Sequence, residues 1–558
     1  MKNTPEKKCK KIKDPIYGYI TIEENYIKNI IDTPVFQRLR RVMQTSYSPL
    51  YSSALHNRFV HSLGVYHLGT IVSERLEKSL KEQNIIDEEI VDNLTHVYKL
   101  ACLLHDVGHA PFSHTGEIFY KHYMENNEDQ YKAKKLHERL CQLVNSEAFK
   151  KDLPIESKST APHEIMSAII GIKNFRDFIG DEEDCEFFAR CITGYTYKSY
   201  NPLNNVRNCF VGMLNSKVID VDRLDYLIRD AYTSGFETVN IDYNRLLNAI
   251  TVKEYLDNPR IVYRKDAVSV IENVVYAHDA EKKWIQNHPV VLYEAFIIKH
   301  ILENIGRNLD KKDNRLFSEN ALSVEGCKLK GGIHISLLCD DDIIYLAKNM
   351  YSDEISKELF DRNKRRHPVW KSEAEYRAYI RNNATSEDHR LLTMCMLSFV
   401  KGIPEFPAPT LINEETLAKC KEELEESYNN PNINGNACKR KYNLCQYLYD
   451  YAVSHGFPCD YMFLPANMFT SNFSKDYMKK TLINIDGNEP VEFHTVCNIL
   501  NAESNKENST DNNTKNPDMY YLYYRSAEPA DGKPGKIENV KEFCNGLLKT
   551  VKVTNPPE

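Results

Sequence analysis

The spacing of apolar residues changes along this chain. Of all the sequence features, this change constrains the possible folds most strongly. Residues 62–80 repeat apolar side chains at helical intervals, and residues 95–104 are more evenly apolar, as in a buried helix. Further helices are predicted at 163–179, 216–233, 243–256, 267–285 and 290–309. The last third instead contains strand-like segments, namely YMFLPANMF, KTLINI, VEFHTVCNIL and MYYLYYR. We therefore predict a mainly α fold with a helical body and a smaller C-terminal α+β lobe.

The chain is longer than one hydrophobic core usually supports, since it has 558 residues. We predict a basic tail at 1–13, the helical body at 14–370 and the C-terminal lobe at 371–558. Within the last third, PEFPAP (404–409) has the composition of a connector. The Asn-rich stretches 428–437 and 500–517 have the composition of solvated loops.

Composition points to a reduced, cytoplasmic compartment. The fifteen cysteines form no CxxC pair, so neither a disulfide framework nor a zinc ribbon is expected. No segment is apolar for long enough to span a membrane, and no apolar segment follows the basic N-terminus as a signal peptide requires. The net charge of −7 disfavours nucleic-acid binding as the main function but leaves a local basic groove open.

The dipeptide His105-Asp106 stands out by its context. The chain has a second His-Asp pair at His278-Asp279, so the dipeptide alone means little. The first pair, however, closes an apolar helix and runs into HDVGHAPFSHTGE, which adds further imidazole and carboxylate groups within a dozen residues. Imidazole and carboxylate together suit borderline divalent metals. Neighbouring residues on a helix point about 100° apart, so other elements must complete such a site.

Residues 218–232 offer a further carboxylate. In VIDVDRLDYLIRDAY, Asp222, Tyr226 and Asp230 stack at i, i+4 and i+8 on one helical face. This stripe could line a pocket, although spacing alone favours a solvated outer face. His61, at the start of the amphipathic helix in HNRFVHSLGV, is a further candidate donor.

Taken in order, these motifs resemble a known family. R-x-x-H, then H-D-x-G-H-x-P-F-S-H, then D-x-D-x-x-D-Y-x-x-R-D are similar to the HD-superfamily deoxynucleoside triphosphate triphosphohydrolases. The local match is nearest to members that join a sterile alpha motif to an HD domain, although nothing here suggests that extra domain. The likeness begins at DPIYGYI (14–20) and fades near residue 366. It implies an HD-domain helical core.

The resemblance implies a divalent metal ion, which could be manganese, magnesium, iron, nickel or zinc. Its ligands would be His61, His105, Asp106 and Asp222. Arg58 would brace the phosphates, and His114 would protonate the leaving 5′-oxygen. Glu117, where the family usually has Asp, would orient that imidazole. His109 and His163 match positions that contact phosphates or the proton-transfer group.

Substrate selection is also implied by the resemblance. Gln44 matches a residue near the sugar 3′-hydroxyl, and Tyr226 matches one that packs on the sugar and disfavours a 2′-hydroxyl. Asp230 matches a carboxylate near the sugar, and Arg223 replaces a lysine that touches the phosphates. His278 and His288 align with further substrate-binding positions, His278 in place of an arginine.

A third implication is regulation by a nucleotide activator. Asp32, Gln37 and Arg40 match residues that recognise a guanine nucleotide at a subunit interface, and Arg245 and Arg264 match arginines of an adjoining nucleotide site. Asp266 replaces a lysine there. A plain local alternative exists for the first group, because Asp32 or Thr33 can cap a helix that Pro34 opens.

These features predict an enzyme that hydrolyses deoxynucleoside triphosphates to deoxynucleoside and triphosphate, as a homo-oligomer (dimer or tetramer) without a membrane partner. Two alternatives stay open. One is an HD phosphohydrolase that acts on another nucleotide or phosphate ester. The other is a binding module whose HD pocket senses a nucleotide.

Overall fold

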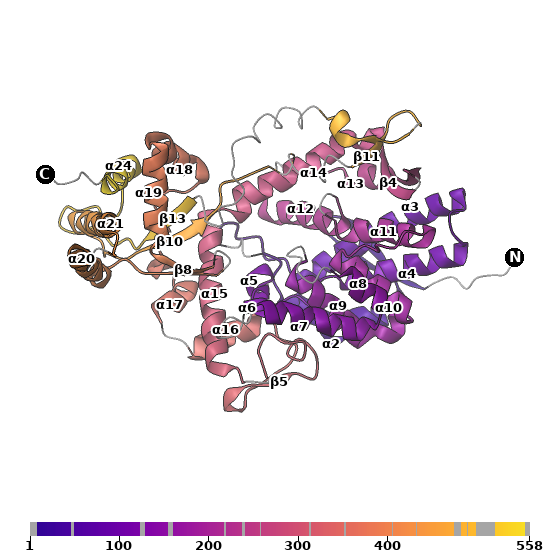
Figure 1. Cartoon of the computed structure of the whole chain (residues 1–558). Coiled ribbons are helices and arrows are strands. Elements are labelled where there is room, and N and C mark those ends of the chain that lie inside the picture. Colours follow the sequence, from indigo (N-terminus) through magenta and orange to yellow (C-terminus); the bar gives the residue numbers. More distant parts are fainter. Residues whose placement is uncertain are drawn as a thin grey trace. The chain divides into compact units, whose positions relative to one another are not determined.

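The structure is a computed structural model (Figure 1). It describes residues 8–45, 49–122, 129–153, 160–216, 219–236, 240–256, 258–311, 314–350, 353–403, 406–430, 432–471, 473, 481–487, 489–497 and 519–552. Two compact units form, each from three stretches of chain. The first comprises Met1–Lys282, Ile301–Tyr351 and Ser471–Thr510, and the second comprises Lys283–His300, Ser352–Thr470 and Asp511–Glu558. Because the units interleave along the chain, they do not test the predicted division at residues 13 and 370.

Helices dominate the first unit. The chain forms α1 (Glu24–Tyr26), α2 (Pro34–Gln37), α3 (Arg58–Gln83), α4 (Glu88–Leu104), α5 (His114–Glu117), α6 (Phe119–His122), α7 (Asp129–Val144), α8 (Glu147–Asp152), α9 (Pro162–Ile179), α10 (Glu182–Thr193), α11 (Pro202–Leu214), α12 (Val221–Ser234), α13 (Tyr243–Asn248), α14 (Val268–Glu281) and α16 (Asp340–Met350). α4 packs against α3, α9, α10 and α11. These contacts explain why the second half of α4 is apolar on nearly every side.

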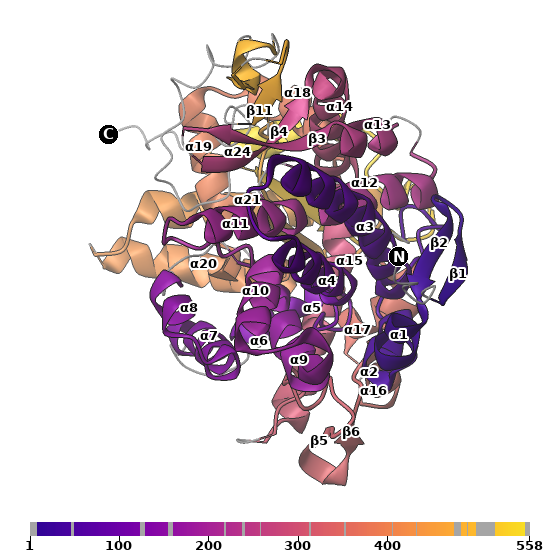
Figure 2. The same ribbon diagram turned by 90° about the vertical axis from the view of Figure 1, so that its right-hand side faces the viewer.

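Strands in the first unit form small sheets. β1 (Cys9–Asp14) and β2 (Gly18–Glu23) make an antiparallel hairpin, as do β5 (Cys327–Lys328) and β6 (His334–Ile335). A four-stranded sheet has the order β12-β11-β4-β3, built from β3 (Ile250–Tyr255), β4 (Asn258–Arg264), β11 (Leu482–Asn484) and β12 (Val491–Glu492). Figure 2 shows β11, β4 and β3 side by side, with β11 parallel to β4.

The second unit is the α+β part. It contains α17 (Glu354–Phe360), α18 (Glu373–Tyr379), α19 (Ser386–Leu397), α20 (Glu414–Asn429), α21 (Gly435–His455) and α24 (Val540–Thr550). Its sheet has the order β10-β13-β7, from β10 (Tyr461–Ala466), β13 (Met519–Tyr524) and β7 (His367–Pro368). All six side chains of β13 are buried, which accounts for its uninterrupted apolar and aromatic sequence. The unit boundary at residue 300 falls within α15 (Pro289–Leu309).

The predicted fold class is confirmed, since the chain is mainly helical with a smaller α+β part. Several local predictions are wrong. In VEFHTVCNIL, predicted as a strand, only Val491–Glu492 is a strand and Phe493–Thr495 is a 3-10 helix, and the loop predicted at 428–437 lies partly within α20 and α21. The helix predicted at 243–256 ends at Asn248, and Ile250–Tyr255 forms β3 instead, because its β-branched residues pair with β4. The predicted connector forms β9 (Phe406–Pro409), which pairs with β8 (Val400–Ile403). The loop predicted at 500–517 lies outside the described residues.

All fifteen cysteines are free, as predicted. Among the described residues, no helix is both long enough and apolar enough to cross a membrane.

Candidate metal centre

Four candidate ligands come from the ends of three helices. Asn57 caps α3 by accepting a hydrogen bond from the Val60 N–H, and His61 follows in the first turn. Asp220 caps α12 in the same way, and Asp222 is the second residue of that helix. His105 and its successor Asp106 end α4. Capped helix starts and a helix end therefore hold the donors in place.

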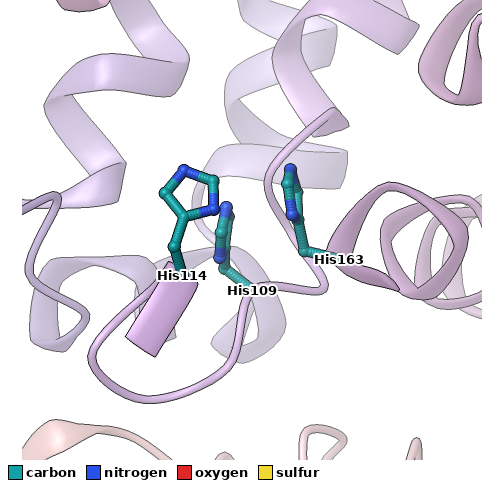
Figure 3. Close-up of side chains that lie close together, drawn as sticks. All are labelled: His109, His114 and His163. Carbon is teal, nitrogen blue, oxygen red and sulfur yellow. The ribbon is translucent and has the colours of Figure 1, made fainter. Parts of the chain in front are cut away.

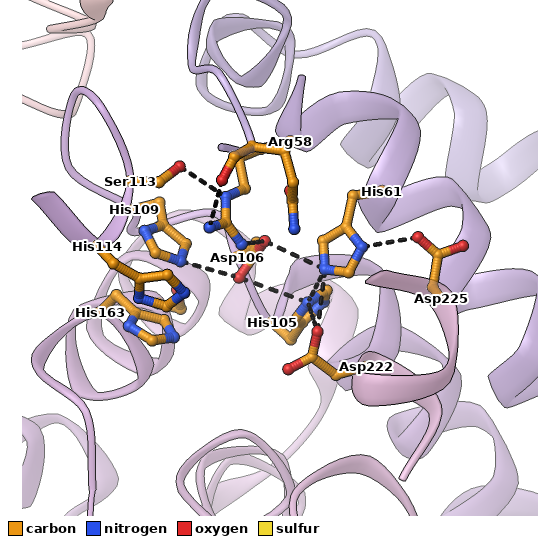
Figure 4. A network of polar contacts seen from close by, with 12 residues as sticks. Arg58, His61, His105, Asp106, His109, Ser113, His114, His163, Asp222 and Asp225 are labelled. Atoms are coloured by element: carbon orange, nitrogen blue, oxygen red, sulfur yellow. Dashed lines mark hydrogen bonds and ion pairs between the residues drawn. The ribbon is translucent and has the colours of Figure 1, made fainter. Parts of the chain in front are cut away.

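The four side chains converge (Figure 4). Nε2 of His61 lies 3.2 Å from Nε2 of His105 and 3.0 Å from Oδ1 of Asp222. The two oxygens of Asp106 lie 3.4 Å from Nε2 of His105 and 3.5 Å from Nε2 of His61. His61, His105 and Asp222 satisfy the spacing expected of metal ligands. Two imidazole nitrogens that face each other among carboxylates suit a divalent cation between them.

The tautomer of His105 is consistent with this arrangement. Its Nδ1 donates a hydrogen bond to the carbonyl of Cys102 at 2.9 Å, which leaves Nε2 as the coordinating atom when the ring is neutral.

The electrostatic field at this cluster favours positive charge. Burial lowers the pKa of His61, but hydrogen bonds to Asp222 and Asp225 outweigh it and raise that pKa to about 9. Burial raises the pKa of Asp106, but Arg58 and the two histidines outweigh it, so the pKa lies well below its usual range. A field that favours a proton on His61 also favours a metal cation.

Arg58 makes three side-chain hydrogen bonds within the protein. Its Nη1 lies 2.7 Å from Asp106 Oδ2, its Nε donates to Ser113 Oγ at 2.8 Å, and its Nη2 donates to the Gln44 carbonyl at 3.3 Å. The side chain is buried. Arg58 therefore fixes Asp106 and the 109–117 segment relative to α3.

A second cluster lies on the other side of Asp106. The rings of His109 and His163 stack with centroids 4.0 Å apart, and His114 meets both edge-on (Figure 3). Glu117 accepts hydrogen bonds from Nδ1 of His114, at 3.2 Å, and from Nδ1 of His163. His109 is fully buried, and neither of its ring nitrogens has a hydrogen-bond partner in the described part of the chain. Burial, with the nearby cations, holds its pKa well below the usual range.

The segment that joins His109 to His114 is strained. Phe112 and Ser113 have φ values of 58° and 53°, which non-glycine residues rarely adopt. Asp340, at the start of α16, accepts hydrogen bonds from the N–H groups of Phe112 and Met43 at 2.8 and 2.9 Å. These contacts hold a conformation that is costly by itself.

Three of the predicted substrate residues share α12. The Arg223 Nε donates to the Tyr226 hydroxyl at 3.4 Å, and the buried Asp230 accepts from Nε2 of His56 at 2.7 Å. The stripe is therefore not the solvated face that spacing alone favours. The buried Oε1 of Gln44 lacks a hydrogen-bond partner among the described residues.

Two more predicted residues lie elsewhere. His278 is half-buried on α14. His288 belongs to the second unit, where its Nδ1 accepts a hydrogen bond from the Val290 N–H at 3.2 Å. Their roles stay predictions.

Two of the residues predicted to bind an activator, Gln37 and Arg40, already have side-chain partners within the chain. Gln37 donates to the Ile31 carbonyl at 2.6 Å, and Arg40 donates to Gln37 at 2.8 Å while lying 3.5 Å above the Phe59 ring. Asp32 ends a π-helical turn and is exposed.

The two arginines of the predicted adjoining nucleotide site, Arg245 and Arg264, differ in their contacts. The Arg264 guanidinium pairs with both oxygens of Asp266, at 3.2 and 3.0 Å, while Arg245 is exposed on α13. Thr33 occupies the N-cap position before Pro34 but makes no side-chain capping bond.

Sequence reasoning missed Asp225, which accepts a hydrogen bond from Nδ1 of His61 at 2.7 Å. It also missed Arg229, Asp14 and Tyr17 beyond it, and His56 and Asp340. Asp225 and Arg229 both lie in the D-x-D-x-x-D-Y-x-x-R-D motif, but their i, i+4 spacing is also that of an ordinary exposed ion pair, so the sequence did not indicate their role.

The chain is similar to several known proteins. The HD domain family matches residues 58–174. An uncharacterized protein of Mycoplasma genitalium is 31% identical over 265 residues, covering 47% of this chain and 52% of that protein. The deoxynucleoside triphosphate triphosphohydrolase SAMHD1 of Homo sapiens is 28% identical over 302 residues, covering 50% of this chain and 42% of that protein. The Dictyostelium discoideum SAMHD1 homolog is 30% identical over 243 residues, with 43% and 39% covered.

The matched regions thus span about half, or less, of these relatives. A hypothetical protein from Aquifex aeolicus has a solved structure with a TM-score of 0.51 at 18% identity, over 98% of this chain and 100% of that one, which supports the fold alone. The chain therefore carries an HD domain, and its predicted resemblance to the HD-type deoxynucleoside triphosphate triphosphohydrolases is confirmed.

Proposed function

We propose that this protein is a metal-dependent phosphohydrolase that splits deoxynucleoside triphosphates into deoxynucleoside and triphosphate. The observation that carries the proposal is the convergence of two imidazoles and two carboxylates beside a second imidazole cluster. His61, His105, Asp106 and Asp222 would hold the ion. A bound divalent ion polarises the phosphorus centre and lowers the pKa of a bound water.

The second cluster suits phosphate binding and proton transfer. His109, His114 and His163 offer several ring nitrogens next to Arg58. His114 is the exposed member, and its Nδ1 is held by Glu117. This leaves its Nε2 free to carry a proton to the leaving 5′-oxygen, and Glu117 stabilises the imidazolium before transfer. Burial raises the pKa of the Glu117 carboxyl, whereas His163 and His114 lower it. The effect of the histidines is larger, so this pKa lies well below its usual range.

Substrate selection would fall to residues beside the metal centre. The unpartnered amide oxygen of Gln44 can accept a hydrogen bond from a sugar hydroxyl. Tyr226, on the same helix as Asp222, would pack on the sugar, with Asp230 nearby and Arg223 towards the phosphates. His278 and His288 are kept as proposed substrate contacts from the family pattern.

The test is product identification. Purified protein is mixed with dGTP and Mg²⁺ or Mn²⁺, alone and with all four deoxynucleoside triphosphates, and inorganic products are resolved by ion chromatography. We expect tripolyphosphate, and we expect Asp106→Ala to abolish its release. Asp341→Asn, at an exposed neighbour of Asp340, is the control and should remain active. Orthophosphate or pyrophosphate as the product would instead favour another phosphate ester as substrate, and no product in any mixture would favour a binding module.

We also propose a homo-oligomer whose assembly or activity responds to a guanine nucleotide bound near Asp32, Gln37, Arg40, Arg245 and Arg264. The support is the family pattern. Light scattering with and without GTP tests it, and a mass that is unchanged, together with unchanged activity, would contradict it.

A further inference from the structure

We infer that Asp225, Arg229, Asp14 and Tyr17 form a buried chain of hydrogen bonds that positions His61 as a metal ligand and makes the N-terminal hairpin part of the metal centre. This inference rests on the proposed metal dependence. It does not depend on which phosphate ester is the substrate.

The first link fixes the tautomer of His61. Nδ1 of His61 lies 2.7 Å from Oδ2 of Asp225, and both side chains are fully buried. A carboxylate can only accept, so Nδ1 donates, and Nε2 is left to face the other ligands. A carboxylate that holds the far nitrogen of a ligating histidine sets the ring's orientation and raises its basicity.

The second link holds Asp225 itself. Arg229 donates to both of its oxygens, at 2.9 and 3.0 Å, and the Tyr17 hydroxyl donates to Oδ1 at 2.7 Å. With His61, this carboxylate accepts four hydrogen bonds. Asp225 therefore cannot rotate to bind the ion in place of Asp222.

The third link reaches the hairpin of β1 and β2. Nη1 of Arg229 lies 3.0 Å from Oδ2 of Asp14. The other oxygen of Asp14 accepts from the N–H groups of Ile16 and Tyr17, at 2.8 and 3.0 Å, and so forms the turn. The charges alternate in sign from Asp14 through Arg229 to Asp225.

Stability alone does not account for this arrangement. A buried ion pair is weak evidence of a purely stabilising role, because apolar side chains can often replace such a pair without loss of stability. A glycine of α3, Gly64, provides the space that the Asp225–Arg229 pair occupies. A Cβ added at Gly64 would lie 1.8 Å from Oδ1 of Asp225 and 2.5 Å from Nη2 of Arg229. Gly64 stands one helical turn after His61, so the ligand and the space for its support come from the same helix.

The test is the affinity of the whole chain for Mn²⁺, measured by isothermal titration calorimetry after metal removal. Asp225→Asn should weaken Mn²⁺ binding about 10- to 100-fold, as loss of such a support does elsewhere. Glu358→Gln is the matched control, since Glu358 is also a fully buried carboxylate that accepts hydrogen bonds from an arginine, Arg366, and from a tyrosine hydroxyl, that of Tyr293. Its Mn²⁺ affinity should equal that of the wild type.

Tyr17→Phe provides a second variant in case Asp225→Asn does not fold. It removes one donor to Asp225 and should weaken Mn²⁺ binding between about twofold and tenfold. Circular dichroism of the metal-free proteins verifies folding. Wild-type affinity in folded Asp225→Asn would overturn the inference, as would wild-type affinity in Tyr17→Phe if Asp225→Asn is unfolded.

The two proposals fail in different ways. If the wild type binds Mn²⁺ but releases no tripolyphosphate, the proposed function fails while the affinities still decide the role of Asp225. If tripolyphosphate is released and Asp225→Asn binds Mn²⁺ normally, only the present inference fails.

Discussion

Gly64 is the residue at which packing around the metal centre is tightest. Gly64→Ala should lower the free energy of unfolding by about 3 kcal/mol, because the new methyl group displaces the Asp225–Arg229 pair. Urea unfolding of the metal-free protein measures this. Gly212→Ala is the control: Gly212 lies in the last turn of α11 and no atom lies within 4 Å of a Cβ added there, so a stabilisation of up to about 1 kcal/mol is expected. Equal effects of the two substitutions would contradict the packing argument.

A second prediction for a single residue concerns Glu117. Glu117→Gln removes the negative charge that holds Nδ1 of both His114 and His163. We expect kcat to fall by about tenfold or more with a smaller change in KM, because the general acid loses its orientation rather than its contact with substrate. Steady-state kinetics on dGTP measure both constants. Glu325→Gln, an exposed residue paired with Lys173, should leave them unchanged, and a KM effect alone in Glu117→Gln would point to binding instead.

Some residues of the candidate site could be predicted from the sequence, and others could not. The motif order suffices to select His61, His105, Asp106 and Asp222, because each lies in a distinctive local pattern. Asp225 lies in the same motif as Asp222, but its role depends on a contact with His61, 164 positions away. The same holds for Asp340, whose hydrogen bonds to Met43 and Phe112 span more than two hundred residues.

At the scale of elements, α16 controls the strained segment that carries His109 and His114. Burial raises the pKa of Asp340 to about 7, from 3.8 in an unfolded chain. Between about pH 4 and 7 the folded state keeps a proton that the unfolded state has released, so this group's contribution to stability falls as pH rises.

Asp340→Asn should therefore gain stability relative to the wild type on going from pH 5 to pH 8. Urea unfolding of both proteins at both pH values measures the difference. A pH-independent difference for Asp340→Asn would show that its carboxyl does not titrate in this way.

Helices and strands that depend on local sequence could be predicted, whereas those that depend on distant pairing could not. The helices α3, α4, α9 and α15 follow from periodicity, because each buries one face or all of its faces locally. Ile250–Tyr255 does not, because its strand conformation depends on pairing with Arg260, Ile261 and Val262 in β4. β9 was missed for a similar reason: its prolines suggest a connector, but an edge strand tolerates them.

For the whole molecule, the metal ion should act as a stabilising ligand. At a free Mn²⁺ concentration 100-fold above Kd, the stabilisation is about 2.7 kcal/mol, which raises Tm by a few degrees. Differential scanning calorimetry with and without Mn²⁺ measures the shift. Asp222→Ala should show none, and an equal shift in that variant would indicate that Mn²⁺ binds elsewhere.

The parallel pairing of β11 with β4 has a consequence for how the protein is made. Ile483 pairs with Tyr263, 220 positions earlier, while the proposed ligands all precede residue 223. A ribosome that adds about 5–20 residues per second needs roughly ten to forty seconds to supply that partner strand. During this interval the metal centre can assemble while one edge of β4 remains open. The nascent chain is therefore most prone to aggregation through β4, and a chaperone that covers this edge would protect it until synthesis reaches β11.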